Sequence, residues 1–191
     1  MAEKKKRKGR RSYLNDFYTD VSGNIVYNGR MLTYHGELPY PAARLRIGIY
    51  CGLVFACVFA VACLPAPSML GFGKTYVILP FILEVIGLLL VVWAAVRMLY
   101  HGESLREYVY EASAKKLPWW LEMTAFFAAA SAVCNVIYVA LNGFGGQVVL
   151  SLLVVALHIL AILFALLGVR FLRKITWSDR GEELPPPESG K

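Results

Sequence analysis

The sequence predicts an all-α integral membrane protein: a bundle of four transmembrane helices with a small cytoplasmic N-terminal arm that holds a β-hairpin. Three observations support this fold class. The chain is 58% hydrophobic and 17% charged, with a mean hydropathy of +0.53, a balance typical of membrane proteins. Its basic residues flank the apolar stretches almost entirely on one side. Four apolar stretches can each supply the ~20 residues that a membrane span needs, at about 45–64, 76–98, 118–141 and 148–171.

The positions of the basic residues predict how the bundle is oriented. Of the 20 Lys and Arg residues, 19 lie up to Arg46, within residues 97–117 or from Arg170 onward, and only Lys74 lies in the other two loops. Cytoplasmic loops are enriched in Lys and Arg, so we expect both termini in the cytoplasm. The compact loops and the lack of N-x-S/T sequons favour a bacterial plasma membrane.

Residues 1–44 form the predicted cytoplasmic arm, which begins with a strongly basic run. Residues 4–11, KKKRKGRR, resemble a nuclear-localisation or nucleic-acid patch when taken alone. In front of a membrane bundle we expect them instead to attract anionic lipid headgroups, worth about 1 kcal/mol per basic residue near the surface. The partners expected from the sequence are therefore the lipid bilayer and another membrane protein or a second copy, with no nucleic acid.

The rest of the arm carries turn signals that predict a β-hairpin near residues 25–32. Asn28-Gly29 suits the two positive-φ positions of a type I′ turn, and β-branched or aromatic residues flank it. A second turn signal, at residues 20–24, lies just before it. The hairpin could dock on the cytoplasmic face of this protein or on a partner, or it could be a short ordered linker.

The first span, at 45–64, carries small residues at every fourth position. Such spacing lets two helix backbones approach closely, so it predicts a helix-packing face and no chemistry. The residues that form this face are Gly48, Gly52, Ala56 and Ala60.

The second span, at 76–98, organises the rest of the chain because it contains a carboxylate, Glu84, in an otherwise apolar run. A carboxylate at membrane depth costs about 2.5–3.5 kcal/mol on insertion scales, so it seldom faces lipid. We therefore expect Glu84 to face the bundle interior and to meet a polar neighbour there. Pro80 lies one turn before it and can kink the helix.

The loop after the second span and the C-terminal tail give weaker signals. Ser104-Leu-Arg-Glu107 fits a capping box, and apolar residues follow it at helical spacing. This predicts either a short amphipathic helix on the membrane surface or a plain connector. Residues 173–191 are polar and Pro-rich, and we expect this tail to be disordered.

The third and fourth spans place further polar residues inside the bundle. Ser131, Asn135 and Tyr138 share one face of the third span, and His158 is the one ionisable residue of the fourth. At 1.5 Å per residue, Glu84 and Asn135 lie roughly 12 Å, and His158 roughly 15 Å, from the outer ends of their helices. The sequence therefore predicts an intramembrane polar cluster of these five residues.

The cluster admits three interpretations. A buried Glu beside a His can exchange protons at physiological pH, which suits a proton or cation site. Interhelical hydrogen bonds can instead simply fix the helix register. Catalysis is not expected, because the chain has no HExxH or GxSxG motif and its four cysteines all lie in apolar spans without metal-ligand spacing. No cofactor or metal is expected.

Two functions follow as expectations. The first is a non-enzymatic accessory or scaffold subunit of a membrane complex, in which the arm and the packing faces contact a partner. The alternative is a small proton- or cation-coupled transporter that uses Glu84 and His158.

Overall fold

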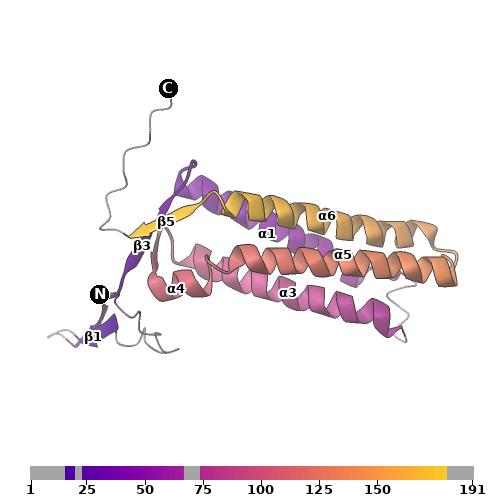
Figure 1. Cartoon of the computed structure of the whole chain (residues 1–191), viewed down its shortest axis with the longest axis horizontal. Helices are drawn as coiled ribbons and strands as arrows, with labels where there is room; N and C mark the ends of the chain where they lie inside the picture. The colour runs from indigo at the N-terminus through magenta and orange to yellow at the C-terminus, as the bar shows by residue number, and fades with distance from the viewer. Residues whose placement is uncertain (1–15, 20–22, 67–73, 180–191) are drawn as a thin grey trace, which may run out of the picture.

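The computed structural model describes residues 16–19, 23–66 and 74–179, and four long helices dominate it (Figure 1). All four are long and apolar enough to cross a membrane, which confirms the predicted mostly helical fold with four candidate spans. The first helix begins at Tyr40, before the predicted span at 45–64, because a helix accepts proline in its first turn, here Pro41. The helices are α1 (Tyr40–Cys63), α3 (Thr75–Tyr100), α5 (Leu117–Asn142) and α6 (Val148–Leu172).

The helices form a closed four-membered ring. The main contacts join α3 to α5, α5 to α6 and α6 to α1, and α1 meets α3 over a smaller area. Two glycines allow the closest approaches. A Cβ atom at Gly87 would lie 2.8 Å from Thr124 Oγ1, and one at Gly168 would lie 3.3 Å from Leu121 Cδ1. In this ring α3 and α6 are diagonal partners that run in the same direction.

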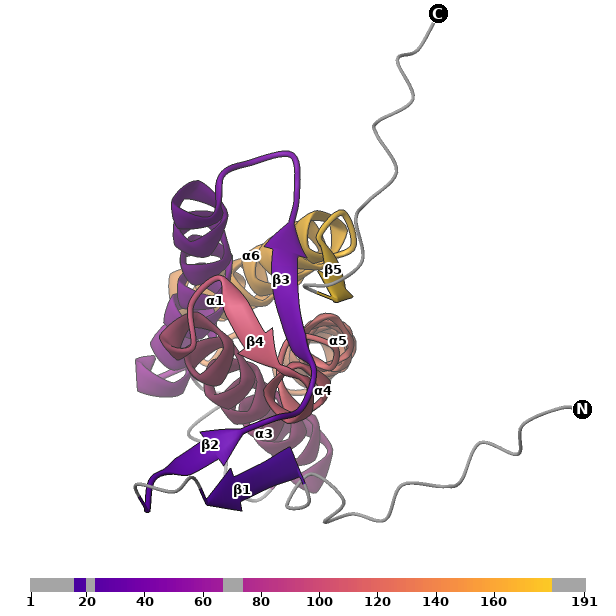
Figure 2. The same cartoon turned by 90° about the vertical axis from the view of Figure 1, so that its left-hand side faces the viewer.

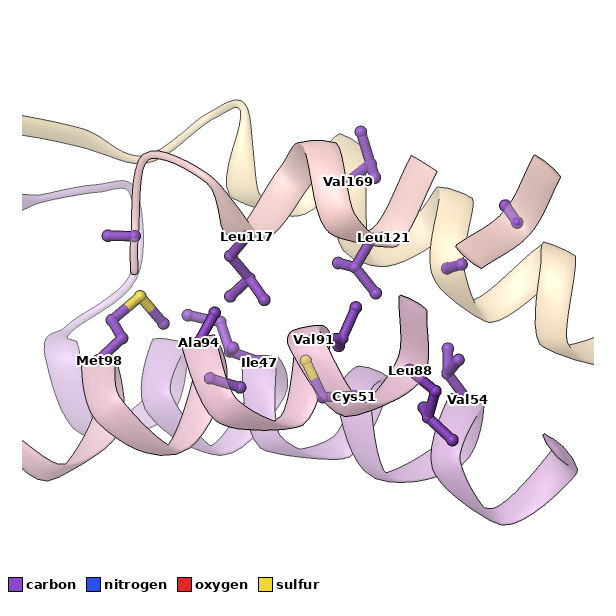
Figure 3. Close-up of a cluster of buried hydrophobic side chains, with 14 of the residues drawn as sticks. Ile47, Cys51, Val54, Leu88, Val91, Ala94, Met98, Leu117, Leu121 and Val169 are labelled. Atoms are coloured by element: carbon purple, nitrogen blue, oxygen red, sulfur yellow. The ribbon is translucent and has the colours of Figure 1, made fainter. Parts of the chain in front are cut away.

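Each helix turns one apolar face inward and another outward. On α5 the buried residues recur at spacings of three and four, for example Leu121, Thr124 and Ala128, which places them on a single face. Large apolar side chains such as Phe126 and Leu152 are exposed on the opposite faces. A helix that is apolar all round suits a membrane environment. Figure 3 shows the main interior cluster, in which Val54, Leu88 and Leu121 meet between the helices.

The small residues of α1 point away from the bundle. Gly52 and Ala56 are exposed, Gly48 and Ala60 are half-buried, and a Cβ atom at either glycine would meet nothing within 4 Å. The inward face of α1 instead carries larger side chains such as Ile47, Val54 and Val61. Packing inside this bundle therefore does not use the small face, and packing against another protein stays a prediction.

A three-stranded antiparallel sheet, here named the cap, covers one end of the bundle (Figure 2). Its central strand β3 (Met31–His35) pairs with β4 (Ser104–Arg106) on one side and with β5 (Thr176–Asp179) on the other. The cap thus joins the arm, the segment after α3 and the segment after α6. Leu105 of β4 is fully buried and belongs to the main hydrophobic core, so the cap and the bundle share that core.

Aromatic side chains hold the outer strand of the cap in place. The rings of Tyr34 and Trp177 pack edge to face with centroids 5.8 Å apart, and the Tyr34 hydroxyl donates a hydrogen bond of 3.0 Å to the carbonyl of Leu38. Burial, with a smaller effect from the Glu37 carboxylate, raises the pKa of the Tyr34 phenol. The phenol therefore remains a hydrogen-bond donor.

The hairpin of the arm lies one turn earlier than predicted. Strand β1 (Phe17–Thr19) pairs with β2 (Ile25–Tyr27) across residues 20–24, so the predicted hairpin near 25–32 is wrong. Neither Asn28 nor Gly29 has a positive φ, as a type I′ turn would require. Asn28 and Gly29 instead connect β2 to β3 without forming a hairpin, because β3 pairs with distant segments rather than with β2.

The hairpin of β1 and β2 contacts the short helix α4 (Glu107–Ala112) through aromatic rings. The centroids of Phe17 and Tyr27 are 5.1 Å apart, and each lies about 6 Å from the ring of Tyr108. The Arg106 guanidinium stands over the Tyr27 ring, 5.2 Å from its centroid. Such cation–π contacts contribute about 0.5–1 kcal/mol at exposed sites. The arm therefore docks on this protein's own cap end.

Three further expectations for the cap end need correction. Ser104 is part of β4 and makes no capping bond to α4, whose N-cap is Arg106, because pairing with β3 fixes this backbone as a strand. Val109 of α4 is fully buried against the core, so this helix packs on the bundle. Residues 176–179 of the tail form a strand rather than a disordered segment. The basic run 4–11 and the end of the tail lie outside the described residues.

We expect Gly87→Ala to lower the free energy of unfolding in detergent by about 1–3 kcal/mol, because the added methyl group overpacks the α3–α5 contact. Gly52→Ala is the matched control. Its new Cβ atom meets nothing, and alanine favours a helix over glycine by up to about 1 kcal/mol. Thermal and denaturant unfolding of the two variants measure the difference. Equal effects at both positions would contradict the close approach of α3 and α5.

Candidate functional site

The carboxylate of Glu84 and the imidazole of His158 meet inside the bundle. Glu84 Oε2 lies 3.2 Å from His158 Nε2, and both residues are fully buried. Because α3 and α6 are diagonal across the ring, this contact crosses the centre of the bundle. At 1.5 Å per residue, both positions lie roughly 14 Å from the start of their helices. The structure thus brings together the two ionisable residues that the sequence places at similar depth.

The hydrogen bonds of His158 show where its protons are. Its Nδ1 lies 2.7 Å from the carbonyl oxygen of Val154. A carbonyl oxygen can only accept, so Nδ1 must carry the hydrogen. Nε2 is then a lone-pair atom unless the ring is protonated, and it faces an oxygen of Glu84. Two lone pairs 3.2 Å apart repel each other, so the contact requires one proton, carried either by the carboxyl group or by the imidazole.

The pair leaves hydrogen-bonding capacity unused. Although Oε2 and Nε2 are within ion-pair distance, their alignment does not meet hydrogen-bond geometry, and Glu84 Oε1 has no donor among the described residues. A buried polar group left unsatisfied costs about 1–3 kcal/mol. Glu84 Oε1 can therefore accept a further hydrogen bond.

The surroundings of the pair are apolar. On the side of the cap lies the main core, and on the opposite side a small cluster of Val61, Ala66 and Val154 packs together. Phe81 contacts both clusters, and its ring lies edge-on to His158 with centroids 6.3 Å apart. Along the bundle axis the pair therefore lies between two hydrophobic clusters.

The other predicted site residues lie on α5 at and beyond the level of the pair. Since Gly168 of α6 lies opposite Leu121 of the antiparallel α5, the helical rise places Ser131 level with His158 and Asn135 about one turn farther from the cap. Both are buried, and Asn135 Nδ2 donates a hydrogen bond of 2.8 Å to the carbonyl of Ser131. Tyr138 is half-buried, farther still from the cap.

One buried polar residue of α6 was not among the predicted site residues. Ser151 is 4% exposed, and its hydroxyl has no hydrogen-bond partner among the described residues. It lies two turns before His158 on the same helix face, and this spacing is the signal in the sequence that could have found it. It extends the set of buried polar groups away from the cap.

The side chains present limit the chemistry of the site. Across residues 16–19, 23–66 and 74–179, no three His, Cys, Asp or Glu side chains gather where a metal ion could bind. A lone carboxylate beside an imidazole can hold one proton, or one small monovalent cation when that proton is lost. Comparison of the chain with known protein families, with characterised proteins and with solved structures finds no match. The residues themselves therefore carry the functional argument.

Replacing the pair by leucine tests whether the two groups act as one unit. We expect Glu84→Leu and His158→Leu each to destabilise the bundle, because each leaves a buried polar group without its partner. The double variant should be destabilised by less than the sum of the two, with a coupling of about 0.5–3 kcal/mol. Unfolding in detergent measures all three. Additive effects would show that the two groups do not interact.

Proposed function

We propose that this chain is a small membrane protein that binds one proton at the Glu84–His158 pair and exchanges it for a small monovalent cation. The observation that carries the proposal is the 3.2 Å contact between two fully buried groups, because such a contact requires one proton. The unpartnered Oε1 adds a position at which a second ligand can bind.

Exchange follows from the charge balance of the pair. With its proton in place, the pair carries no net charge, whether as a carboxylic acid beside a neutral imidazole or as a carboxylate beside an imidazolium. Loss of the proton leaves one negative charge in an apolar layer, which is costly. A monovalent cation at the carboxylate oxygens would restore neutrality. Competition of proton and cation for one carboxylate is the simplest basis for coupled transport.

We further propose that the cap lies on the cytoplasmic side of a bacterial plasma membrane. Among the described residues, every Lys and Arg except Lys74 lies at the cap end of the bundle or in the cap itself. Lys74 precedes α3 at the opposite end. This distribution is the one that the positive-inside rule associates with a cytoplasmic face, and the basic run at residues 4–11 would add to it by attracting anionic lipid headgroups.

A second candidate function, an accessory or scaffold subunit of a membrane complex, is favoured by the outward small face of α1. Gly48 and Gly52 leave room for another helix backbone at this face, and small residues at this spacing are common where membrane helices associate. The arm pairs with this chain's own strands and aromatic rings, so α1 rather than the arm supports this candidate.

The exchange proposal is tested with purified protein in sealed proteoliposomes that contain a pH-sensitive dye. We expect an imposed Na⁺ or K⁺ gradient to change the lumenal pH with the wild-type protein, and Glu84→Gln to abolish the change because the amide cannot carry the proton. Glu111→Gln, at an exposed position of α4, is the matched control and should behave as wild type. Persistence of the flux in Glu84→Gln would refute the proposal.

The accessory proposal is tested by two identical substitutions at exposed positions of different helices. We expect Ala56→Leu to disrupt association with a second membrane protein or copy, because it fills the small face of α1. Ala129→Leu, on the outward face of α5, should leave association unchanged. Native mass measurement after gentle extraction compares them. A monomer of this chain alone, with both variants indistinguishable from it, would exclude the candidate.

A further inference from the structure

The buried polar side chains of the bundle differ on the two sides of the pair. Toward the cap, the hydroxyls of Ser113 and Thr124 donate to carbonyls of their own helical turns, at 2.6 and 2.9 Å. At the level of the pair and away from the cap, Ser131 Oγ, Asn135 Oδ1 and Ser151 Oγ have no partner among the described residues. These three residues, here named the polar seam, are at most 4% exposed. Thr33, Tyr40 and Ser178 also have unpartnered hydroxyls, but these lie in the cap and at the start of α1. Between the pair and the cap, the described residues therefore leave no buried side-chain oxygen unpartnered.

The polar seam follows the contact between α5 and α6, which are antiparallel neighbours. Ser131 is level with His158, Asn135 lies about one turn farther from the cap, and Ser151 lies roughly 10 Å beyond His158 along α6. Residues 141–149, which end α5 and begin α6, are all exposed. The seam thus extends from the pair toward the exposed end of the bundle.

The cap side of the pair is closed by close-packed apolar residues. Leu88, Val91 and Leu121 are buried in the main core (Figure 3), and the helical rise places them between the pair and the cap. Leu105 of the cap and Val109 of α4 are also fully buried. A proton needs a chain of polar groups or water, which such a region does not provide.

No carboxylate or imidazole other than the pair itself lies on the buried faces of the four helices. The titratable groups on the buried faces of α1 and α5 are the thiols of Cys51 and Cys57, both on α1, and α3 and α6 contribute to their buried faces only Glu84 and His158 themselves. A relay toward the cap would therefore have no carboxylate or imidazole to use.

We propose that the Glu84–His158 pair exchanges its proton more rapidly with the solvent at the end of the bundle opposite the cap, along the polar seam, than with the solvent on the cap side. This inference rests on the proposed function, since it names the path of the same proton. The hydroxyls of Ser131 and Ser151 can donate and accept hydrogen bonds and the amide oxygen of Asn135 can accept them, so together they can order water molecules. Along such a chain, each water molecule forms an O–H bond with the arriving proton and breaks another O–H bond to release a proton to its neighbour. No other reactant is needed.

Infrared spectroscopy of the Glu84 carboxyl group tests the path without relying on transport. The carbonyl band of the protonated carboxyl is identified as the band lost in Glu84→Gln. The intensity of this band is then followed in the full-length protein, reconstituted in one orientation in sealed vesicles. Protease cleavage of the C-terminal tail establishes that orientation. We expect the band to respond faster to a pH change in the compartment opposite the cap than to one on the cap side.

Variants along α5 and α6 locate the path. We expect Asn135→Leu and the smaller change Ser151→Ala each to slow the response of the band by about tenfold, equivalent to roughly 1.4 kcal/mol on the barrier. Thr124→Val is the matched control: it removes a buried hydroxyl from the same face of α5 on the cap side of the pair, and it should respond at the wild-type rate.

The outcomes separate the two proposals. A band that responds faster to the pH on the cap side, or equally fast to the pH on both sides, overturns the proposed path and leaves proton binding at the pair intact. A band that responds to pH in detergent, but to the pH of neither compartment of the vesicles, also overturns the proposed path. A band that responds to pH in no preparation refutes proton exchange at the pair, and the proposed function with it.

Discussion

The contact between Glu84 and His158 is the constraint on which the interior of this protein depends. A carboxylate at membrane depth is costly, and a buried charge is stable only when it is paired or neutralised. Here the carboxyl group of Glu84 meets an ionisable partner, the imidazole of His158, at 3.2 Å. Because the two groups come from diagonal helices, their contact also fixes how deeply α3 and α6 sit relative to each other, and with them the α1 and α5 helices between.

The two ends of the bundle are built differently around this contact. At one end, the three strands of the cap close over an apolar core that extends from Leu105 to Leu88. At the other, buried hydroxyl and amide oxygens lie along α5 and α6 and the helix ends are exposed. A site that binds a proton in such a bundle faces unequal barriers on its two sides. This asymmetry arises from packing alone, since among the described residues no Asp, Glu, Lys, Arg or His other than the pair is buried.

The cap restrains the ends of the helices that it joins. Strand β3 comes from the arm, β4 follows α3 and β5 follows α6, so pairing ties the cap-side ends of three helices to one sheet. The aromatic contacts of Tyr34, Tyr108 and Trp177 add packing at the same end. The helix ends at the cap are therefore held more tightly to one another than the ends away from it.

The sequence by itself determined the four spans, the inward face of α5 and the shared depth of Glu84 and His158. Those features depend on local composition and on the helical repeat, and polar residues such as Ser131 and Asn135 mark which face of α5 avoids lipid. It did not determine the strand pairing of the cap, because β3 pairs with segments more than 70 and 140 residues away, and the Asn28-Gly29 turn signal could not outweigh those partners. Nor did it determine the rotation of α1. That helix is apolar on every side and has no buried polar residue to orient it, so only its packing against α6 and α3 decided that its small residues face outward.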